Sequence, residues 1–339
     1  MPRLTAYEIA RLKGLNAAQE EHQRLGTLMH DRVAIFDVIE DAQIWLFFQP
    51  LRNLYGAYER QGDVAGIIVN SQHPLTLQRF TAAHEYGHHM LNHIASADDE
   101  DRIYRGGNQS MQEVAAQAFA GEFVMPIQLV NYTLRTMGVT GQHPSLTPEQ
   151  IYQLALELGV SYSAVLTQLV GQHKLSVDVG RRLRRVSPLD IKTGLGGVKP
   201  EYSWADVWLL DESQEGRRLT PRLRDEIHVT LPEIPSTGYV WELVEAASNL
   251  LELVDDHFKE AGTGSVGGHG VRHLWFRVKN PGDGRIRLEM RRPWQVDGQL
   301  ASSFEATLVA SAPRTGEVRD GITVDQKQGL IDDFRTTAA

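Results

Sequence analysis

The sequence predicts two domains: a mostly helical α+β domain with a small sheet, followed by an all-β sandwich. A chain of 339 residues is too long for one ordinary domain. Helical patterns dominate up to about residue 198, and seven short alternating runs divided by Gly and Pro turns follow, as in an antiparallel β-sandwich. We therefore expect domains at residues 1–190 and 205–312, a linker at 191–204 and a polar tail at 313–339.

The overall composition is that of a globular protein able to bury a sizeable core, with 42% hydrophobic and 23% charged residues. The formal net charge of −9 argues against a protein that binds nucleic acids or acidic membranes. The N-terminal segment lacks the apolar core of a signal peptide, and no run approaches the ~20 apolar residues of a membrane span. We expect a soluble, cytoplasmic protein with no nucleic acid and no membrane among its partners.

The chain contains no cysteine, which limits the chemistry that it can perform. Disulfides, thiolate catalysis and cysteine-ligated zinc sites are all excluded. Any metal ion must therefore be bound by His, Asp or Glu side chains.

The elements expected in the first half follow from local patterns. Residues 1–30 are polar and favour a helix, and the apolar run IWLFF at 44–48 is expected to be buried. The short β-branched run VAGIIVN at 64–70 predicts a strand. After a turn, a helix is predicted from about residue 75 to 94, and the acidic stretch at 96–109 predicts a loop.

Further helices are expected before the β-rich half. Ser110 is a candidate N-cap for a helix that ends at Met125. Thr147 and Pro148 occupy the cap and first-turn positions of the next helix, and the run SYSAVLTQLVGQHKL predicts one more. The turn-rich stretch at 181–197 marks the joint between the two domains.

Runs of alternating apolar and polar residues in the second half predict strands, because Gly and Pro turns separate them. They are ADVWLL, EIHVTL, YVWELV, LLELV, VRHLWFRV, RIRLEM and SFEATLV. We expect these strands to form the two sheets of the sandwich.

The stretch RFTAAHEYGHHMLNH, residues 79–93, is the strongest candidate for a functional site. On a helix, His84 and His88 are four residues apart and present two imidazoles to one point. Glu85 lies about 100° round the helix and can reach a water at that point without being a ligand. This H-E-x-x-H spacing is typical of zinc hydrolases, in which zinc lowers the pKa of water to roughly 7 and the carboxylate takes its proton.

A second histidine pair, His89 and His93, is also four residues apart. Met90 stands where a base would be needed, and the pair points about 100–140° away from the face of His84 and His88. We interpret this second pair as outer contacts of the site or as ordinary polar positions.

A third protein ligand has to come from another segment, and QEVAAQAFAGEFVMP at 112–126 offers Glu113 and Glu122. These two residues are nine apart and hence lie on opposite faces of a helix. Glu113 shares its face with small residues such as Ala116, which let this helix lie close to Gly87. We predict Glu113 as the third ligand and expect Glu122 to be solvated.

Both blocks, in the order GIIVN…RFTAAHEYGHHMLNH and then E-x-x-A-x-x-F-A-x-E-x-x-M-P, resemble the ImmA/IrrE family of metallopeptidases. The resemblance covers roughly residues 1–190. It implies a regulatory role, because members of this family cleave helix-turn-helix repressors. Tyr86 stands where the family usually has Leu and Gln117 where it often has Asn, and neither position is a ligand.

The resemblance also implies a zincin-like fold with a gluzincin-type site that holds one zinc ion per chain. The implied ligands are His84, His88 and Glu113, and Glu85 is the implied base. The residue that stabilises the oxyanion stays open among four candidates. They are Tyr86, His93, Tyr104 and Arg105.

Three loops of the second half, LPEIPSTGYVWEL, GSVGGHGVRHLWF and RRPW, resemble those of the chagasin-like cysteine-protease inhibitors. The resemblance covers about residues 205–312 and implies an immunoglobulin-like sandwich whose three loops gather at one end and enter the cleft of a papain-like protease. The loop residues that it implies in protein binding are Pro235, Ser236, Thr237, Gly238, Gly267, Gly268, Arg292, Pro293 and Trp294. Ile234 replaces the usual Asn, and His269 interrupts the glycine loop.

Two classes of function are compatible with these motifs. One is a zinc endopeptidase whose sandwich domain selects partners or regulates access; the other is a non-catalytic inhibitor or adaptor on a metal-binding scaffold. A metal-dependent sensor that rarely turns over is a third possibility. We favour the enzyme, because Glu85, which degenerate peptidases typically lose, is present together with all three ligands.

Overall fold

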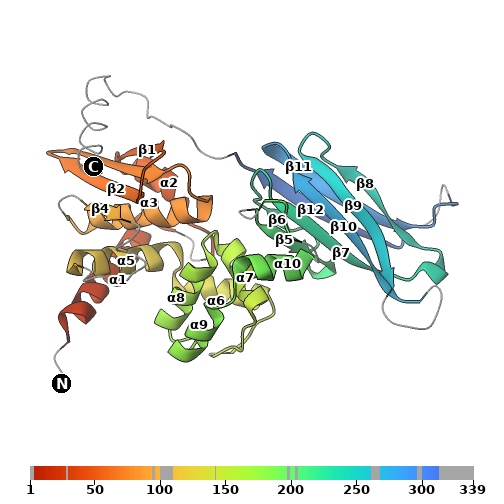
Figure 1. The fold of residues 1–339 in the computed structure, drawn as a ribbon, viewed down its shortest axis with the longest axis horizontal. Coiled ribbons are helices and arrows are strands. Elements are labelled where there is room, and N and C mark those ends of the chain that lie inside the picture. The colour runs from red at the N-terminus through yellow and green to blue at the C-terminus, as the bar shows by residue number, and fades with distance from the viewer. Residues whose placement is uncertain are drawn as a thin grey trace. The chain divides into compact units, whose positions relative to one another are not determined.

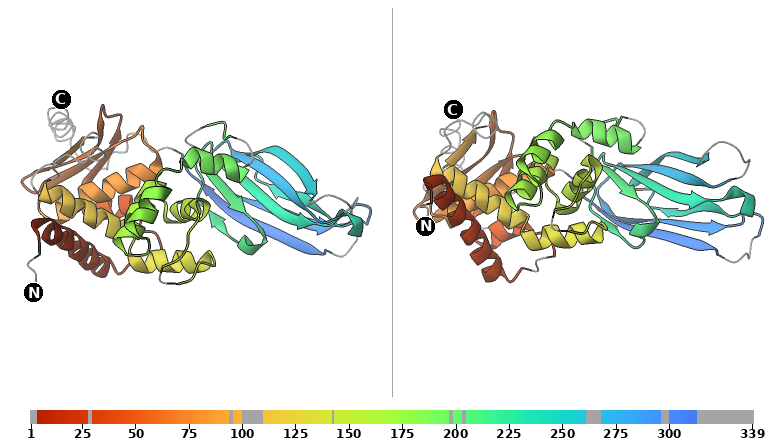
Figure 2. Two further views of the ribbon diagram at one scale, coloured as in Figure 1. Left: turned by 60° about the horizontal axis from the view of Figure 1, so that its bottom comes forward. Right: turned by 90° about the horizontal axis from the view of Figure 1, so that it is seen from below.

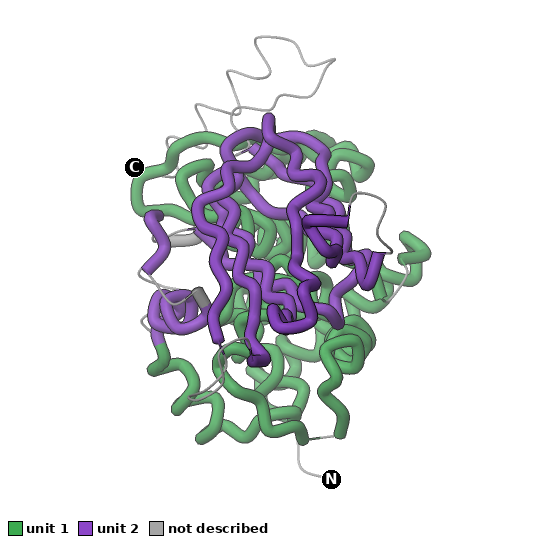
Figure 3. Tube along the Cα trace, turned by 90° about the vertical axis from the view of Figure 1, so that its right-hand side faces the viewer, with its two compact units in different colours: residues 1–186, 314–339 green, residues 187–313 purple. Residues whose placement is uncertain are grey.

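The structure is a computed structural model, drawn as ribbons in Figures 1 and 2, that describes most of the chain. The described residues are 4–27, 30–93, 96–99, 110–141, 143–196, 199–202, 205–260, 268–295 and 300–312. Two compact units divide the chain, Met1–Val186 and Ser187–Pro313, and Figure 3 colours them green and purple. The predicted tail at 313–339 lies outside the described residues.

The first unit combines helices with one small sheet, as the sequence predicts. Its helices are α1 Ala6–Leu25, α2 Ile35–Asp41, α3 Leu75–Met90, α5 Met111–Val124, α6 Ile127–Thr136, α7 Pro148–Leu158, α8 Tyr162–Gly171 and α9 Val177–Leu183. Its strands are β1 Trp45–Gln49, β2 Leu54–Gln61, β3 Val64–Asn70 and β4 Ser96–Asp99, in the order β1-β3-β2-β4. Among the described helices none could cross a bilayer alone; α7 and α8 together have the length and hydropathy but meet at 99°.

Local sequence explains where the helices of the site begin. The Ser110 hydroxyl accepts a hydrogen bond from the backbone N–H of Glu113, so it caps α5 as predicted. Thr147 and Gln150 form a reciprocal capping box at the start of α7. The acidic segment after α3 was predicted to be a loop, but its first residues, Ser96–Asp99, form strand β4 and pair with β2. Pairing with an available sheet edge outweighs its low β-propensity.

The first unit is layered: α3 packs on the sheet, α5 packs on α3, and α1 packs on α5 (Figure 1). Glycines set the distance between the last three layers. A side chain at Gly87 on α3 would come within 3.0 Å of the Phe119 ring and 3.2 Å of the Ala116 carbonyl oxygen on α5. At Gly14 on α1, a Cβ atom would overlap the carbonyl oxygen of Ala115. Two glycines therefore let both neighbours lie directly against the backbone of α5.

We expect Gly14→Ala to destabilise the first unit by about 1–3 kcal/mol, because the added methyl group has to push α1 away from α5. Asn16→Ala on the exposed side of α1 is the matched control, and its effect should stay within about 0.5 kcal/mol. Urea unfolding followed by far-UV circular dichroism measures both. Equal stabilities of the two variants would contradict the close packing of α1 on α5.

The second unit is a sandwich of two four-stranded sheets. Its elements are α10 Pro188–Gly196, β5 Val207–Leu210, η1 Glu212–Gln214, β6 Arg218–Leu219, β7 Glu226–Glu233, η2 Pro235–Thr237, β8 Val240–Ala246, β9 Leu251–Glu260, β10 Gly270–Val278, β11 Gly282–Arg291 and β12 Ser302–Ala310. The sheets have the orders β5-β7-β10-β9 and β6-β12-β11-β8 and pack face to face (Figure 2). Every one of the seven predicted runs is a strand, and among the described strands of this unit only the pairs β5–β7 and β12–β6 are parallel.

Apolar side chains at alternate positions of the strands point between the two sheets and form the core of the sandwich. Its fully or almost fully buried side chains come from both sheets and include Val207, Ile227, Val229, Leu231, Trp241, Leu274, Phe276, Ile286, Leu288, Phe304 and Leu308. Their burial is what holds the two sheets together, since it is the largest favourable contribution to folding.

The joint between the domains differs from the prediction, because the expected linker at 191–204 begins with a helix. The units divide after Val186, and α10 covers Pro188–Gly196. The Lys192 ammonium group donates a hydrogen bond to the Ala205 carbonyl oxygen at 2.6 Å, which fastens α10 to the start of β5. Tertiary contacts of this kind stabilise a helix whose Gly-rich sequence does not favour one.

Candidate metal centre

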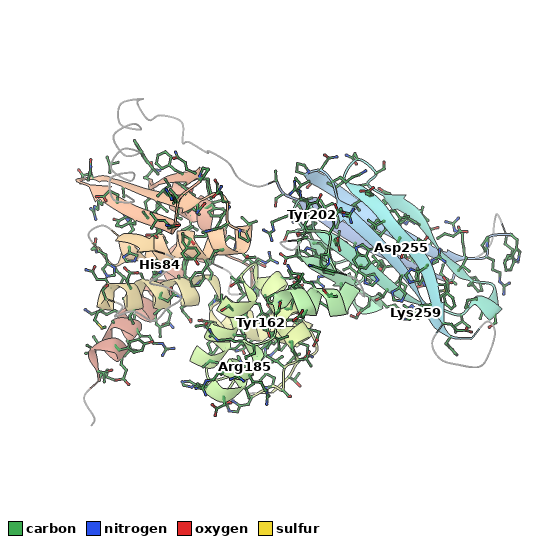
Figure 4. The ribbon with its side chains drawn as sticks, viewed as in Figure 1. His84, Tyr162, Arg185, Tyr202, Asp255 and Lys259 are labelled. Atoms are coloured by element: carbon green, nitrogen blue, oxygen red, sulfur yellow. The ribbon has the colours of Figure 1, made fainter. Side chains whose placement is uncertain are left out.

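Helix α3 carries both predicted histidine ligands on one face, and Figure 4 labels His84 among the side chains of this unit. His84 and His88 are 3% and 0% exposed, and their Nε2 atoms are 3.1 Å apart. The four-residue spacing therefore brings the two imidazoles to one point, as predicted.

Glu113 on α5 completes the group. Its carboxylate oxygens lie 3.2 Å from His84 Nε2 and 3.5 Å from His88 Nε2. Burial raises the pKa of Glu113, but hydrogen bonds from the two imidazoles outweigh burial and hold this pKa well below its usual range. The carboxylate is therefore ionised at neutral pH, which is the form that binds a metal ion.

The donor atoms fit a tetrahedral zinc ion. Ligand atoms about 2.0–2.1 Å from zinc at tetrahedral angles are about 3.3 Å apart. The three separations here are 3.1, 3.2 and 3.5 Å. Among the described residues this is the one group of three or more His, Asp or Glu side chains whose ligand atoms all lie within 4.8 Å of one another. Two imidazoles and one carboxylate form the three-ligand set of a catalytic zinc site with a position left for water.

Glu85 lies beside this group and not within it. Its side chain is fully buried, and a Cβ atom at Gly56 of β2 would be 3.4 Å from Glu85 Oε1. The carboxylate thus occupies the space between α3 and β2 that the absence of a side chain at Gly56 leaves. Glu85 directly follows His84 on α3, and its role as general base stays a prediction.

His93 contacts the site through His88. Their Nδ1 atoms are 3.0 Å apart, so one ring donates a hydrogen bond to the other and fixes the orientation of His88. Burial and the neighbouring His88 lower the pKa of His93 to about 4. His89 instead lies 3.2 Å from the Tyr58 hydroxyl and stacks on Tyr86. One member of the second histidine pair is an outer contact of the site, and the other is an ordinary polar position.

One expectation about a neighbouring residue was wrong, and one of the four open oxyanion candidates is turned elsewhere. Glu122 is 7% exposed and accepts a hydrogen bond from Gln168 Nε2 at 3.4 Å, and burial raises its pKa, so it is not solvated. The Tyr86 hydroxyl donates to Glu21 on α1 at 2.5 Å and therefore does not face the ligands as an oxyanion donor would. The candidates Tyr104 and Arg105 lie outside the described residues.

A cavity of about 620 Å³ opens beside His84, and the sequence patterns did not indicate it. Its wall combines side chains of α1, α3, α5 and α8, which are distant in the sequence. Apolar groups such as Leu77, Phe80 and Val114 line it together with polar ones such as Gln168. A cleft of this size next to the ligands can hold several residues of a peptide.

The three predicted binding loops of the sandwich share one end of it. Gly270 of β10 pairs with Glu233 of β7 and with Glu260 of β9, so the end of β7, the end of β9 and the start of β10 lie at the same edge. Arg291 pairs with Val240 there in the other sheet, which places the turn after β11 beside them. This register brings together the strand ends from which the three loops start, and the binding role of the loop residues stays a prediction.

First and third loops contact each other directly. A Cβ atom at Gly238, whose φ is +79°, would lie 2.5 Å from the Trp294 ring, so the indole packs on the bare glycine. The Arg292 guanidinium donates a hydrogen bond to the Thr237 carbonyl oxygen at 3.3 Å and lies 4.6 Å from the centre of the Tyr239 ring. Trp294 is nevertheless 67% exposed. Of the second loop, Gly268 is described and Gly267 lies outside the described residues.

Family models match both halves of the chain. Residues 39–169 match the IrrE N-terminal-like domain, and residues 220–308 match the chagasin family peptidase inhibitor I42. Curated relatives include Amoebiasin-2 of Entamoeba histolytica, 27% identical over 109 residues that cover 32% of this chain and 88% of the relative. Chagasin of Trypanosoma cruzi is 23% identical over 104 residues, which cover 30% of this chain and 94% of chagasin.

Among solved structures, the cysteine protease inhibitor EhICP2 from Entamoeba histolytica is similar. It has 26% sequence identity and a TM-score of 0.30, with 32% of this chain and 97% of the inhibitor covered. Fold and site together define a metallopeptidase-like domain joined to a β-sandwich of the protease-inhibitor kind. More specifically, the chain carries an IrrE N-terminal-like domain of peptidase family M78, followed by a chagasin-family I42 domain.

Proposed function

We propose that the first unit is a zinc-dependent endopeptidase that cleaves a regulatory protein. The observation that carries this proposal is the convergence of His84, His88 and Glu113 within 3.5 Å of one another. The match to the IrrE N-terminal-like domain supports a peptidase. Resemblance to the ImmA/IrrE family favours a helix-turn-helix repressor as the substrate.

Each side chain of the site has a defined task in peptide hydrolysis. His84, His88 and Glu113 hold the zinc ion, which when bound supplies Lewis acidity toward water and the scissile carbonyl. Glu85 accepts the proton of the attacking water and later delivers it to the departing amine. His93 keeps the Nδ1 side of His88 engaged, so that Nε2 stays available to the metal.

Substrate discovery tests this proposal. The purified chain is incubated with a soluble protein extract, and new N-termini are identified by mass spectrometry in zinc-loaded and metal-depleted samples. We expect a small set of cleavages, enriched in few proteins, that disappears on chelation and returns with zinc. Identical N-termini in both samples would contradict a zinc-dependent endopeptidase.

For the second unit we propose binding of a papain-like cysteine protease through the three loops at one end. The match to the chagasin inhibitor family supports this partner. The observation that favours it is Trp294, a large apolar side chain that is 67% exposed yet packs against Gly238. Exposed aromatic residues that are ordered before binding are typical interface hot spots.

We expect Trp294→Ala to weaken papain inhibition by about 30-fold, or about 2 kcal/mol, because the indole would fill a pocket of the protease cleft. Leu253→Ala on β9 is the matched control, since Leu253 is exposed but lies away from the loop end. Both variants are made in a chain with Glu85→Gln, so that the first unit cannot cut the protease. Full papain activity at high micromolar concentrations of the chain would reject inhibition and favour an adaptor.

A further inference from the structure

Three histidines of the sandwich lie on three adjacent strands of one sheet. They are His228 on β7, His273 on β10 and His257 on β9. In the register, His273 is opposite His257, and Trp275 is opposite His228. Because residues two apart on a strand share a face, all three imidazoles project from the same side of the sheet.

The imidazoles are in contact with one another. His228 Nε2 lies 3.1 Å from His273 Nδ1, and the ring of His257 stacks on that of His273 with centroids 5.0 Å apart. They border a cavity of about 580 Å³ within the second unit, together with Asp255, Lys259, Trp275 and Arg277. Figure 4 labels Asp255 and Lys259 on β9.

Two neighbours fix these rings in the way that outer contacts fix metal ligands. Asp255 Oδ2 is 2.9 Å from His257 Nδ1, so the carboxylate holds a proton on Nδ1 and leaves Nε2 as the unprotonated nitrogen. Trp275 stacks on His228 at 5.0 Å with 21° between the ring planes. The metal centre of the first unit provides an internal comparison, since its two imidazole nitrogens are also 3.1 Å apart.

The rings also have the protonation state that a metal ion requires. Burial lowers the pKa of His228 to about 4, and burial lowers the pKa of His273 as well. Both shifts favour the neutral imidazole, which is the form that has a lone pair to donate. Neutral imidazole is a ligand that Zn²⁺ and its neighbours in the transition series prefer.

We propose that His228, His273 and His257 form a second metal site of this chain, for a divalent transition ion such as Zn²⁺. His228 and His273 already have the separation of two ligands about one ion. The donor atom of His257 does not yet lie with those two nitrogens, and His257 and Asp255, whose side chains are 51% and 56% exposed, turn together to bring it to the ion. The expected zinc content of the whole chain then rises from one ion to two.

A metal ion at this position acts on the loop end of the sandwich. Register places His257 and His273 three residue pairs from Gly270 and Glu260, where the turn between β9 and β10 begins. The ion links β7, β10 and β9 to one another there. Metal binding therefore stiffens the hairpin that carries the second of the three binding loops.

The experiment uses the full chain with His84→Ala and Glu113→Gln, which removes the ligands of the first site. After equilibration with micromolar free Zn²⁺, elemental analysis should find about one zinc per chain. Adding His273→Gln should lower the zinc affinity at least tenfold, and His257→Gln, which changes an exposed side chain and leaves the core intact, should do the same. His269→Gln, an exposed histidine of the same unit, is the matched control and should have no effect.

Cobalt binding provides a second measurement, because Co²⁺ bound by imidazoles in a four-coordinate site absorbs visible light much more strongly, and at other wavelengths, than hydrated Co²⁺. We expect this spectrum in the chain without the first site and its loss in the His257→Gln variant. The proposal is overturned if the chain without the first site binds no Zn²⁺. It is also overturned if the histidine variants and the His269→Gln control bind equally, which would mark adventitious surface binding.

Discussion

Glu113→Gln is expected to release one equivalent of zinc per chain and to lower the zinc affinity of the first site by more than about 100-fold. This loss exceeds the roughly 10–100-fold that follows when a residue behind a ligand is changed. The amide keeps the shape of the carboxylate but loses its charge. The carboxylate oxygens lie 3.2 and 3.5 Å from the Nε2 atoms of His84 and His88. Their negative charge would attract a metal ion bound by the two imidazoles.

Helix α5 offers a matched control for this change. Glu122→Gln alters the same residue type on the same helix at a buried position, but its carboxylate contacts Gln168 and not the histidines. This variant should keep its zinc. The measurement is zinc per chain after dialysis, followed by competition with a chromophoric chelator. Retention of zinc by Glu113→Gln, or its equal loss from Glu122→Gln, would falsify the ligand assignment.

The geometry of the ligand group was predictable because each part of it depends on a local rule. The helical repeat places His84 beside His88, and the Ser110 cap fixes where α5 begins and hence which way Glu113 points. The close approach of α3 and α5 was also expected from Gly87, and the structure has Gly87 against Ala116. Periodicity, capping and glycine placement are properties that a sequence carries directly.

The burial of Glu122 could not be predicted from the helix alone. The opposite face of α5 from Glu113 was expected to meet solvent. In the structure α5 has no solvated side over this stretch, because α1, α3 and α8 all pack on it, at Ala115, Ala116 and Gly121 in turn. Which helices surround a given helix is a tertiary property, so a pattern within α5 does not contain it.

The interpretation of His93 as an outer contact is confirmed, but its predicted direction was wrong for a different reason. Its direction was taken from a continuous helix, but α3 ends at Met90 and Asn92 adopts a left-handed conformation with φ +54°. The backbone N–H of His93 then donates to the His88 carbonyl oxygen at 2.9 Å. This turn brings the His93 ring back toward His88 and makes it an outer contact of the site.

Glu85→Gln is expected to lower kcat by about 10²–10⁴-fold while the zinc content and the fold stay unchanged, because the amide cannot accept the proton of the attacking water. The zinc ligands are untouched, and the added amide hydrogens occupy the same buried space against Gly56. The substrate is the protein whose cleavage responds to zinc in the profiling experiment, followed over a time course by mass spectrometry.

The matched control is His89→Gln on the same helix, next to His88 but turned toward Tyr58. It should keep at least a large part of the activity, whereas Glu85→Gln should not. Elemental analysis and circular dichroism on the same samples separate loss of chemistry from loss of metal or fold. Undiminished turnover in Glu85→Gln, with its zinc in place, would mean that another group accepts the proton. If Glu85→Gln loses zinc together with activity, Glu85 helps to hold the ligands in place, and the loss of activity no longer argues that it is the base.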